Sequence, residues 1–314
     1  MKDRYGRDIV YLRWSITERC NLQCYYCTLQ KEDYSNNPMS LDVIEKLSNI
    51  FKRLGFKYVR ITGGEPTLRK DLVEVVEIMS ERFLQVSLTT NGTLLADISS
   101  DLKKAGLSGV NVSLDSVNSE RFLKITGRNK LNDVIDGIYA ARKAGLSVKL
   151  NTVLLKENIE DISDLIDFSL KEKIPVRFIE LMPFGNVKKE DFVSQEDAIR
   201  RISERYKLES IDEKLGLGPS SYYRVVSKSA EGIIGFIPAI THKFCDSCNK
   251  IRISSSGELL PCLAHPDVKV ELLDVIDNEV ELKERIKKAV ELKPFAHKFN
   301  YETSSRFSMK RIGG

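Results

Sequence analysis

Short apolar runs alternate along the chain with longer amphipathic segments. In the short runs every second residue is apolar, which is typical of a β-strand with one buried face. In the longer segments apolar residues recur at three- and four-residue intervals, which is typical of an α-helix. The predicted strands are Val10–Thr17, Tyr58–Gly63, Gln85–Asn91, Val110–Ser116, Val148–Leu155 and Pro175–Met182.

The helical segments carry recognisable end signals. Three of them follow a residue suited to N-capping, and glycines stand where other helices would end. The predicted helices are Leu41–Leu54 after Ser40, Leu72–Phe83 after Asp71 and Ile162–Leu170 after Asp161, and the terminating glycines are Gly55, Gly106 and Gly145. Six successive strand–helix units predict parallel strands, hence an α/β barrel, complete or incomplete, or an open doubly wound sheet.

The alternation also predicts a polar interior. Arg13, Arg60 and Lys149 share a strand face with other polar residues, whereas the opposite faces are apolar and suited to packing under helices. A packed barrel is filled with branched apolar side chains, so a cationic lining predicts water or a large anionic ligand inside. A half-exposed antiparallel sheet is the alternative, and it fits poorly because helices separate the strands.

Composition indicates a globular enzyme rather than a nucleic-acid or membrane protein. The chain has 314 residues and a net charge of +4, with its Lys and Arg residues dispersed. No signal segment begins the sequence, and no run approaches the roughly 20 apolar residues of a membrane span. All six cysteines fall into two groups of three, which is typical of metal sites and not of disulfides. We therefore expect a cytoplasmic protein.

The first cysteine group has the spacing C-x3-C-x2-C, formed by Cys20, Cys24 and Cys27. Thiolates are the ligands that iron–sulfur clusters select, and three of them would leave one iron of a four-iron cluster open. The alternatives are a zinc site short of one ligand and a buried apolar trio. No histidine lies within this stretch, which weakens the zinc alternative.

The second cysteine group has the spacing C-x2-C-x13-C, formed by Cys245, Cys248 and Cys262. It also supplies three thiolates, and a zinc site completed by His242 or His265 is the alternative. His297 has no such neighbours in sequence and is expected at the surface.

With the loop Gly63-Gly64-Glu65-Pro66, the first cysteine group resembles the signature of the radical S-adenosylmethionine (SAM) superfamily. The string Val112–Asp115 and the residue at the end of the sixth strand match that signature too. In that superfamily the open iron holds SAM and reduces it to a 5′-deoxyadenosyl radical. The SAM contacts that the resemblance implies are Tyr26, Gly63, Gly64, Glu65, Ser113 and Met182.

Over nearly its whole length the chain resembles the GTP 3′,8-cyclase family of molybdenum-cofactor biosynthesis, which has both cysteine groups and a C-terminal Gly-Gly. The resemblance implies an incomplete (β/α)6 parallel barrel in residues 1–185. A C-terminal iron–sulfur-binding domain is implied in residues 186–314, together with two [4Fe-4S] clusters. The implied GTP contacts are Arg13, Arg60, Thr89, Lys149, Lys250, Ile251 and Arg252.

One residue departs from the family pattern. Many members have arginine where this chain has Lys250, which keeps the charge but loses the bidentate geometry of a guanidinium. Lys250 can therefore meet the triphosphate only as a point charge, whereas Arg252 can bind it in a bidentate way. The family's last two glycines, here Gly313 and Gly314, are needed for cyclisation.

The resemblance implies a lyase that abstracts hydrogen from C3′ of GTP and joins C3′ to C8. The product is (8S)-3′,8-cyclo-7,8-dihydroguanosine 5′-triphosphate. Implied partners are an electron donor of flavodoxin or ferredoxin type and the downstream cyclic pyranopterin monophosphate synthase. A homodimer and a tungsten end use stay open.

There are two alternative functions. Another two-cluster radical SAM enzyme, acting on a peptide or tetrapyrrole, is the first alternative. A non-enzymatic iron–sulfur redox sensor is the remote one.

Overall fold

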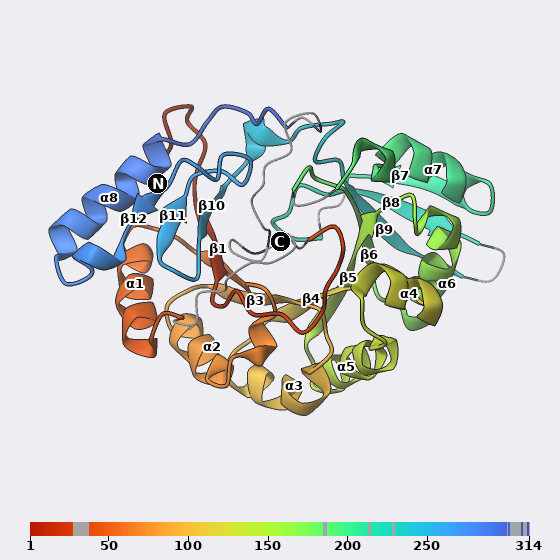
Figure 1. Ribbon diagram of the computed structural model, residues 1–314, viewed down its shortest axis with the longest axis horizontal. Helices are drawn as coiled ribbons and strands as arrows, with labels where there is room; N and C mark the ends of the chain where they lie inside the picture. Colours follow the sequence, from red (N-terminus) through yellow and green to blue (C-terminus); the bar gives the residue numbers. More distant parts are fainter. Residues whose placement is uncertain are drawn as a thin grey trace.

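The computed structural model describes residues 1–27, 38–184, 187–212, 215–227 and 230–299, and the single residues 301, 309 and 313. Among the predicted site residues, Gly314 lies outside this part of the chain. Within it, strands form one curved sheet and helices cover the outside of the curve (Figure 1). In the same part, no helix is long and apolar enough to cross a membrane.

The six predicted strands are confirmed, with ends that differ by a few residues. They pair in chain order, and every pair is parallel. Helices connect them on the outer side of the sheet, as right-handed crossovers require (Figure 1). Their bounds are β1 (Tyr11–Ser15), β2 (Tyr58–Thr62), β3 (Gln85–Thr90), β4 (Gly109–Ser113), β5 (Ser147–Leu154) and β6 (Val176–Glu180).

Strands from the last third of the chain extend this sheet at both edges. β10 (Lys250–Ile253) pairs in parallel with β1, and β9 (Glu231–Ile237) pairs in parallel with β6. Antiparallel strands continue outward on each side, so the described sheet runs from β12 to β7 without closing. This is the incomplete barrel that was predicted. The outer strands are β7 (Lys207–Ile211), β8 (Ser221–Val226), β11 (Glu258–Leu260) and β12 (Val270–Glu271).

The helices cover the apolar outer face of the sheet. Leu12 and Trp14, on one face of β1, are fully buried, as is Ile16 just after the strand, and the Trp14 ring packs edge-on against Phe51 of α1. This burial of large side chains supplies most of the hydrophobic stabilisation of the fold. The bounds are α1 (Leu41–Arg53), α2 (Leu72–Ser80), α3 (Leu95–Lys104), α4 (Ser119–Thr126), α5 (Leu131–Lys143), α6 (Ile162–Glu172), α7 (Gln195–Ser203) and α8 (Glu279–Glu291).

The predicted helix ends are confirmed in part. Ser40 caps α1 by accepting a hydrogen bond from the Val43 N–H, and the three predicted glycines follow α1, α3 and α5 with positive φ. Asp71 and Asp161 occupy the N-cap positions of α2 and α6, as predicted, but their side chains form no capping hydrogen bond. Neither side chain accepts a backbone hydrogen bond from its helix, because an arginine takes the carboxylate instead: Arg69 for Asp71 and Arg121 for Asp161.

Candidate active site

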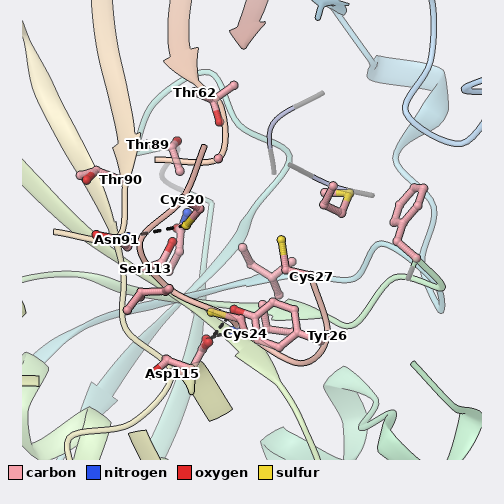
Figure 2. Close-up of a pocket in the computed structure, with 18 of the residues that line it drawn as sticks. Cys20, Cys24, Tyr26, Cys27, Thr62, Thr89, Thr90, Asn91, Ser113 and Asp115 are labelled. Carbon is pink, nitrogen blue, oxygen red and sulfur yellow. Dashed lines mark hydrogen bonds between the residues drawn. The ribbon is translucent and has the colours of Figure 1, made fainter. Parts of the chain in front are cut away.

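The first cysteine group lines a cavity at the carboxyl ends of the barrel strands. Cys20, Cys24 and Cys27 are half-buried and face a common space with Tyr26 (Figure 2). None of the three forms a disulfide. The loop that carries them is fixed by main-chain bonds from Gln23 and Tyr25 to the end of α4.

Tyr26 is anchored to β4 through a buried carboxylate. Its hydroxyl donates to Asp115 Oδ2 at 2.6 Å, and the Val153 N–H donates to the other oxygen at 2.8 Å (Figure 2). Burial raises the pKa of Asp115 to about 6, although both hydrogen bonds oppose the rise. Burial also raises the pKa of Tyr26 well above its ordinary value, so the phenol stays a donor. The cysteine loop is thereby tied to the barrel.

The two glycines after β2 allow the chain that leads to Cys20 to approach closely. The Gly64 N–H donates to Thr17 O at 2.7 Å, and the Glu65 N–H donates to Arg19 O at the same distance. A Cβ on Gly64 would stand 2.4 Å from the Arg19 carbonyl oxygen, so no larger residue fits without moving the backbone. Gly63 and Gly64 both line the cavity.

The Glu65 side chain holds the end of the neighbouring strand β3. The side chain is fully buried and accepts hydrogen bonds from the backbone and hydroxyl of Thr67, the hydroxyl of Thr90 and the N–H of Asn91. Burial raises its pKa, and these four donors counteract the rise. Its predicted contact with SAM stays a prediction, whereas its hydrogen bonds give it a structural role.

A second cavity adjoins the first inside the barrel. Thr89, Asn151, Ile179 and Met182 line both of them, and Ser113 lines the first. A ligand in one cavity therefore lies next to a ligand in the other.

The second cavity is lined by basic side chains, and its described lining residues include no Asp or Glu. Strand register places Arg13 beside Arg60 on one side and beside Arg252 on the other. Like charges on neighbouring strands repel one another, so this arrangement favours an anion between them. The basic residues are Arg13, Arg60, Lys149, Arg177, Lys250, Arg252 and Lys293.

Burial and mutual repulsion weaken the proton affinity of these side chains. Burial, followed by the nearby Arg177 and Arg60, lowers the pKa of Lys149 to about 8. Burial also lowers the pKa of Lys250 to about 8 and that of Arg252 to about 10. Each shift measures the cost of holding a cation there, and a bound polyanion would offset that cost.

Two of the basic residues were not predicted. Arg177 lies on the inner face of β6 and donates to Asn151 Oδ1 at 2.7 Å. The alternation of apolar and polar residues in the sixth strand indicates this position for Arg177, because its neighbours Val176 and Phe178 are fully buried on the other face. Lys293 follows α8 and donates to the carbonyls of Lys250 and Pro261. Nothing in the local sequence marks it.

Ile251 is also a predicted substrate contact, and its side chain is fully buried in the hydrophobic core. Only its main chain is left to face a ligand, so its substrate contact stays a prediction.

The second cysteine group lies in the same cationic cavity. Cys245, Cys248 and Cys262 line it, and no disulfide joins them. Burial raises the pKa of the Cys248 thiol, but Lys293 and Lys250 outweigh it and lower the pKa overall. Lysines beside a thiol stabilise the thiolate that a metal cluster requires.

The geometry bears on the zinc alternative. Among the described residues, no three His, Cys, Asp or Glu side chains lie close enough to share one metal ion. The cysteine ligands of a four-iron cluster lie farther apart than those of a single metal ion, because each cysteine binds a different iron. His242 is exposed and pairs with Glu196 at 3.2 Å. His242, one of the two histidines considered for a zinc site, is therefore held at the surface by a carboxylate.

The expectation that His297 is a surface residue is wrong. It is 7% exposed and lines the second cavity. Its Nδ1 accepts from the Phe299 N–H at 3.4 Å, which fixes the chain after α8 against the cavity wall. The local sequence gives no sign of this burial, because distant segments of the chain form the cavity wall.

Near its end, the chain returns to the barrel interior. Arg252 Nη1 donates to the Gly313 carbonyl, and the Gly313 N–H donates to Met309 O at 2.9 Å. Gly313 has φ +72°, and a Cβ there would stand 2.2 Å from Thr62 Cγ2. Only glycine suits this position, because other residues rarely adopt this positive φ and a side chain would collide with Thr62. Met309 lines the first cavity, and the Gly313 carbonyl contacts Arg252, which lines the second.

Comparison with known proteins agrees with this geometry. Residues 14–169 match the radical SAM superfamily, and residues 174–299 match the family described as Molybdenum Cofactor Synthesis C. A GTP 3′,8-cyclase of Clostridium acetobutylicum is 38% identical over 100% of both chains. One of Listeria monocytogenes is 38% identical over 95% of this chain and 92% of that protein.

Among solved structures, the fold resembles SuiB of Streptococcus suis bound to S-adenosylmethionine. The TM-score is 0.63 at 20% identity, over 85% of this chain and 65% of that one. At this identity the likeness concerns the fold alone. The relatives that align over the full length decide the family. This chain belongs to the radical SAM superfamily and, within it, to the GTP 3′,8-cyclase family.

Proposed function

We propose that this protein converts GTP to (8S)-3′,8-cyclo-7,8-dihydroguanosine 5′-triphosphate, as a lyase of molybdenum- or tungsten-cofactor biosynthesis. The observation that carries the proposal is the pair of adjoining cavities. One has three thiols and the closely packed Gly63-Gly64 turn. The other has seven basic side chains, with no acid among its described lining residues. A radical source and a polyanionic substrate would be neighbours there.

The first cavity fits an iron–sulfur cluster with SAM. Cys20, Cys24 and Cys27 would hold the cluster, and when bound the cluster and SAM supply an electron and a hydrogen-abstracting radical. The chain's part is to hold SAM by the edge of the barrel and to exclude water. The residues proposed for this contact are Tyr26, Gly63, Gly64, Glu65, Ser113 and Met182.

The second cavity would bind GTP. Arg13, Arg60 and Arg252 are in register on neighbouring strands and would bind GTP, together with Lys149 and Lys250. The buried Thr89 hydroxyl has no hydrogen-bond partner among the described residues and borders both cavities. We propose that it binds the ribose, the part of GTP that must face the radical source.

The second cysteine group would hold a second [4Fe-4S] cluster. Cys245, Cys248 and Cys262 share the cavity proposed for GTP, so a cluster there would lie beside the substrate. We propose that this cluster binds the guanine, while the main chain of Ile251 lies alongside. The tail residues Gly313 and Gly314 would act on the bound nucleotide through Arg252, which already contacts the Gly313 carbonyl.

The test is anaerobic turnover by protein reconstituted with iron and sulfide. SAM should be cleaved to 5′-deoxyadenosine only when GTP is present, and the cyclised nucleotide should appear in proportion. ATP and guanosine serve as matched controls for the base and for the phosphates. Cleavage of SAM that is indifferent to GTP would reject the proposal and favour a different substrate.

The partners follow from this chemistry and are proposed with it. A flavodoxin or ferredoxin would supply the electron, and a cyclic pyranopterin monophosphate synthase would consume the product. Residues of one chain form both cavities. The scheme therefore does not depend on a homodimer and does not exclude one.

A further inference from the structure

A glycine-rich loop from the last third of the chain borders the cationic cavity. We call residues 215–220, between β7 and β8, the glycine loop; its sequence is Leu-Gly-Leu-Gly-Pro-Ser. Residues 215–219 line the cavity. Lys149 Nζ, on β5, donates to the Leu215 carbonyl. The loop is thus attached to the basic wall of the barrel.

Two buried donors beside the loop have no hydrogen-bond partner among the described residues. They are Ser220 Oγ and Arg177 Nε, and both residues are 7% exposed. The point where a Cβ on Gly218 would stand is 3.9 Å from Ser220 Oγ and 4.0 Å from Arg177 Nη1. The missing side chain leaves room there for an acceptor. Buried donors are costly when unpaired, so a ligand oxygen is the natural partner.

The main chain of the loop has donors as well. Within the described residues, no backbone–backbone hydrogen bond uses the N–H groups of Gly216, Leu217 or Gly218. Glycine-rich loops can bring such N–H groups close to phosphate oxygens because no Cβ stands in the way.

We propose that the glycine loop binds the terminal phosphate groups of the nucleotide and sets the preference for a triphosphate. The inference rests on the proposed function. The second cysteine group, proposed to hold the base, lies by β10 and β1, whereas the loop lies by β5 and β6. A nucleotide with its base at the cysteines reaches the loop with the far end of its phosphate chain.

The test compares affinities for GTP, GDP, GMP and guanosine in cluster-loaded protein. Ser220→Ala should weaken GTP binding about tenfold, the effect of one hydrogen bond to a charged group. Binding of GMP and guanosine should stay within about twofold of the wild type. Ser221→Ala is the matched control, because Ser221 is the next residue and is exposed. It should leave all four affinities unchanged.

Gly218→Ala is a second variant that should fold normally. Its Cβ meets nothing closer than 3.9 Å, and Gly218 does not have a positive φ. The methyl group would occupy the space beside Arg177, so GTP affinity should fall at least tenfold while the melting temperature stays unchanged. An equal loss for all four ligands, or full GTP affinity in both variants, would overturn the inference.

Inorganic tripolyphosphate separates this inference from the proposed function. If the variants lose tripolyphosphate affinity and the wild type never converts GTP, the loop's role stands and the function fails. If the wild type converts GTP and both variants retain its preference for triphosphate over monophosphate, the function stands and the loop's role fails.

Discussion

At the scale of single residues, the cationic cavity holds charges that water would otherwise stabilise. Arg13 lies between Arg60 and Arg252, and burial with these neighbours lowers its pKa well below the ordinary value. The effect on Lys149 and Lys250 can be tested, because their lowered pKa values of about 8 fall within a pH range where binding can be measured.

Binding of GTP should therefore weaken as the pH rises above about 8. A bound triphosphate favours the charged form of Lys149 and Lys250 and raises their pKa values. Affinity should be constant below about pH 7 and then fall, by up to about tenfold per pH unit for each lysine. Titration of GTP binding between about pH 6.5 and 9.5 measures this.

Guanosine, which lacks phosphate, is the control ligand and should show no such fall. A Lys149→Arg variant keeps its charge at high pH and should flatten the curve. A flat GTP profile for the wild type would contradict this reading of the two lysines.

The sequence predicts part of this lining well. Arg13, Arg60 and Lys149 follow from the period of two in buried strands, since one face of each strand is plainly apolar. Arg177 obeys the same rule and could have been found. Lys293 could not, because its position depends on contacts with Lys250 and Pro261, which are distant in sequence.

At the scale of elements, one buried carboxylate connects three segments. Glu180, the last residue of β6, accepts from the N–H groups of Gln195, Ile240 and Thr241, and from the Thr241 hydroxyl. It thereby joins the barrel to the start of α7 and to the segment that leads to Cys245. Glu180 also lines the first cavity, while the segment that it holds leads to Cys245 in the second.

Replacing Glu180 by glutamine should loosen the second cysteine group more than the first. The amide nitrogen would face N–H donors, which leaves buried groups unpaired and lowers the unfolding free energy by about 2 kcal/mol. Iron bound at the second site should fall, while the first site keeps its iron. Urea unfolding and iron content per chain are the measurements.

Glu204→Gln is the control for this change. It removes an acid from an exposed ion pair with Arg201 at the end of α7 and should cost less than about 1 kcal/mol. Normal iron content in the Glu180 variant would show that the hydrogen bonds accepted by Glu180 do not position the second cysteine group.

The central elements were predictable and the edge strands were not. β1 to β6 repeat one local pattern, so each can be recognised alone. β9 and β10 are placed by pairing with β6 and β1, and no local signal indicates this. The expected division at residue 185 stays a prediction, since β9 and β10 extend the barrel's own sheet.

At the scale of the whole molecule, two cysteine groups far apart in sequence line two adjoining cavities. Each set of thiols is fixed by its own segments: the first by the end of α4, the second by Lys293 and β10. The two sites should therefore be separable by mutation.

Cys24→Ala should abolish SAM cleavage, because the first site supplies the radical. Cys248→Ala should retain part of the SAM cleavage but form no cyclised product, since the substrate would no longer be positioned. Parallel assays of 5′-deoxyadenosine and cyclised nucleotide distinguish the two. Product formation by the Cys248 variant at the wild-type rate would disprove a substrate role for the second group.

The parallel pairing of β1 with β10 also has a consequence for biosynthesis. β1 is synthesised long before its partner strand β10 (Lys250–Ile253), because most of the barrel lies between them in the sequence. Until then the nascent barrel exposes an open β-edge, which is a template for aggregation. The barrel can be completed only once β10 has emerged, and the growing chain should depend on chaperones that shield that edge.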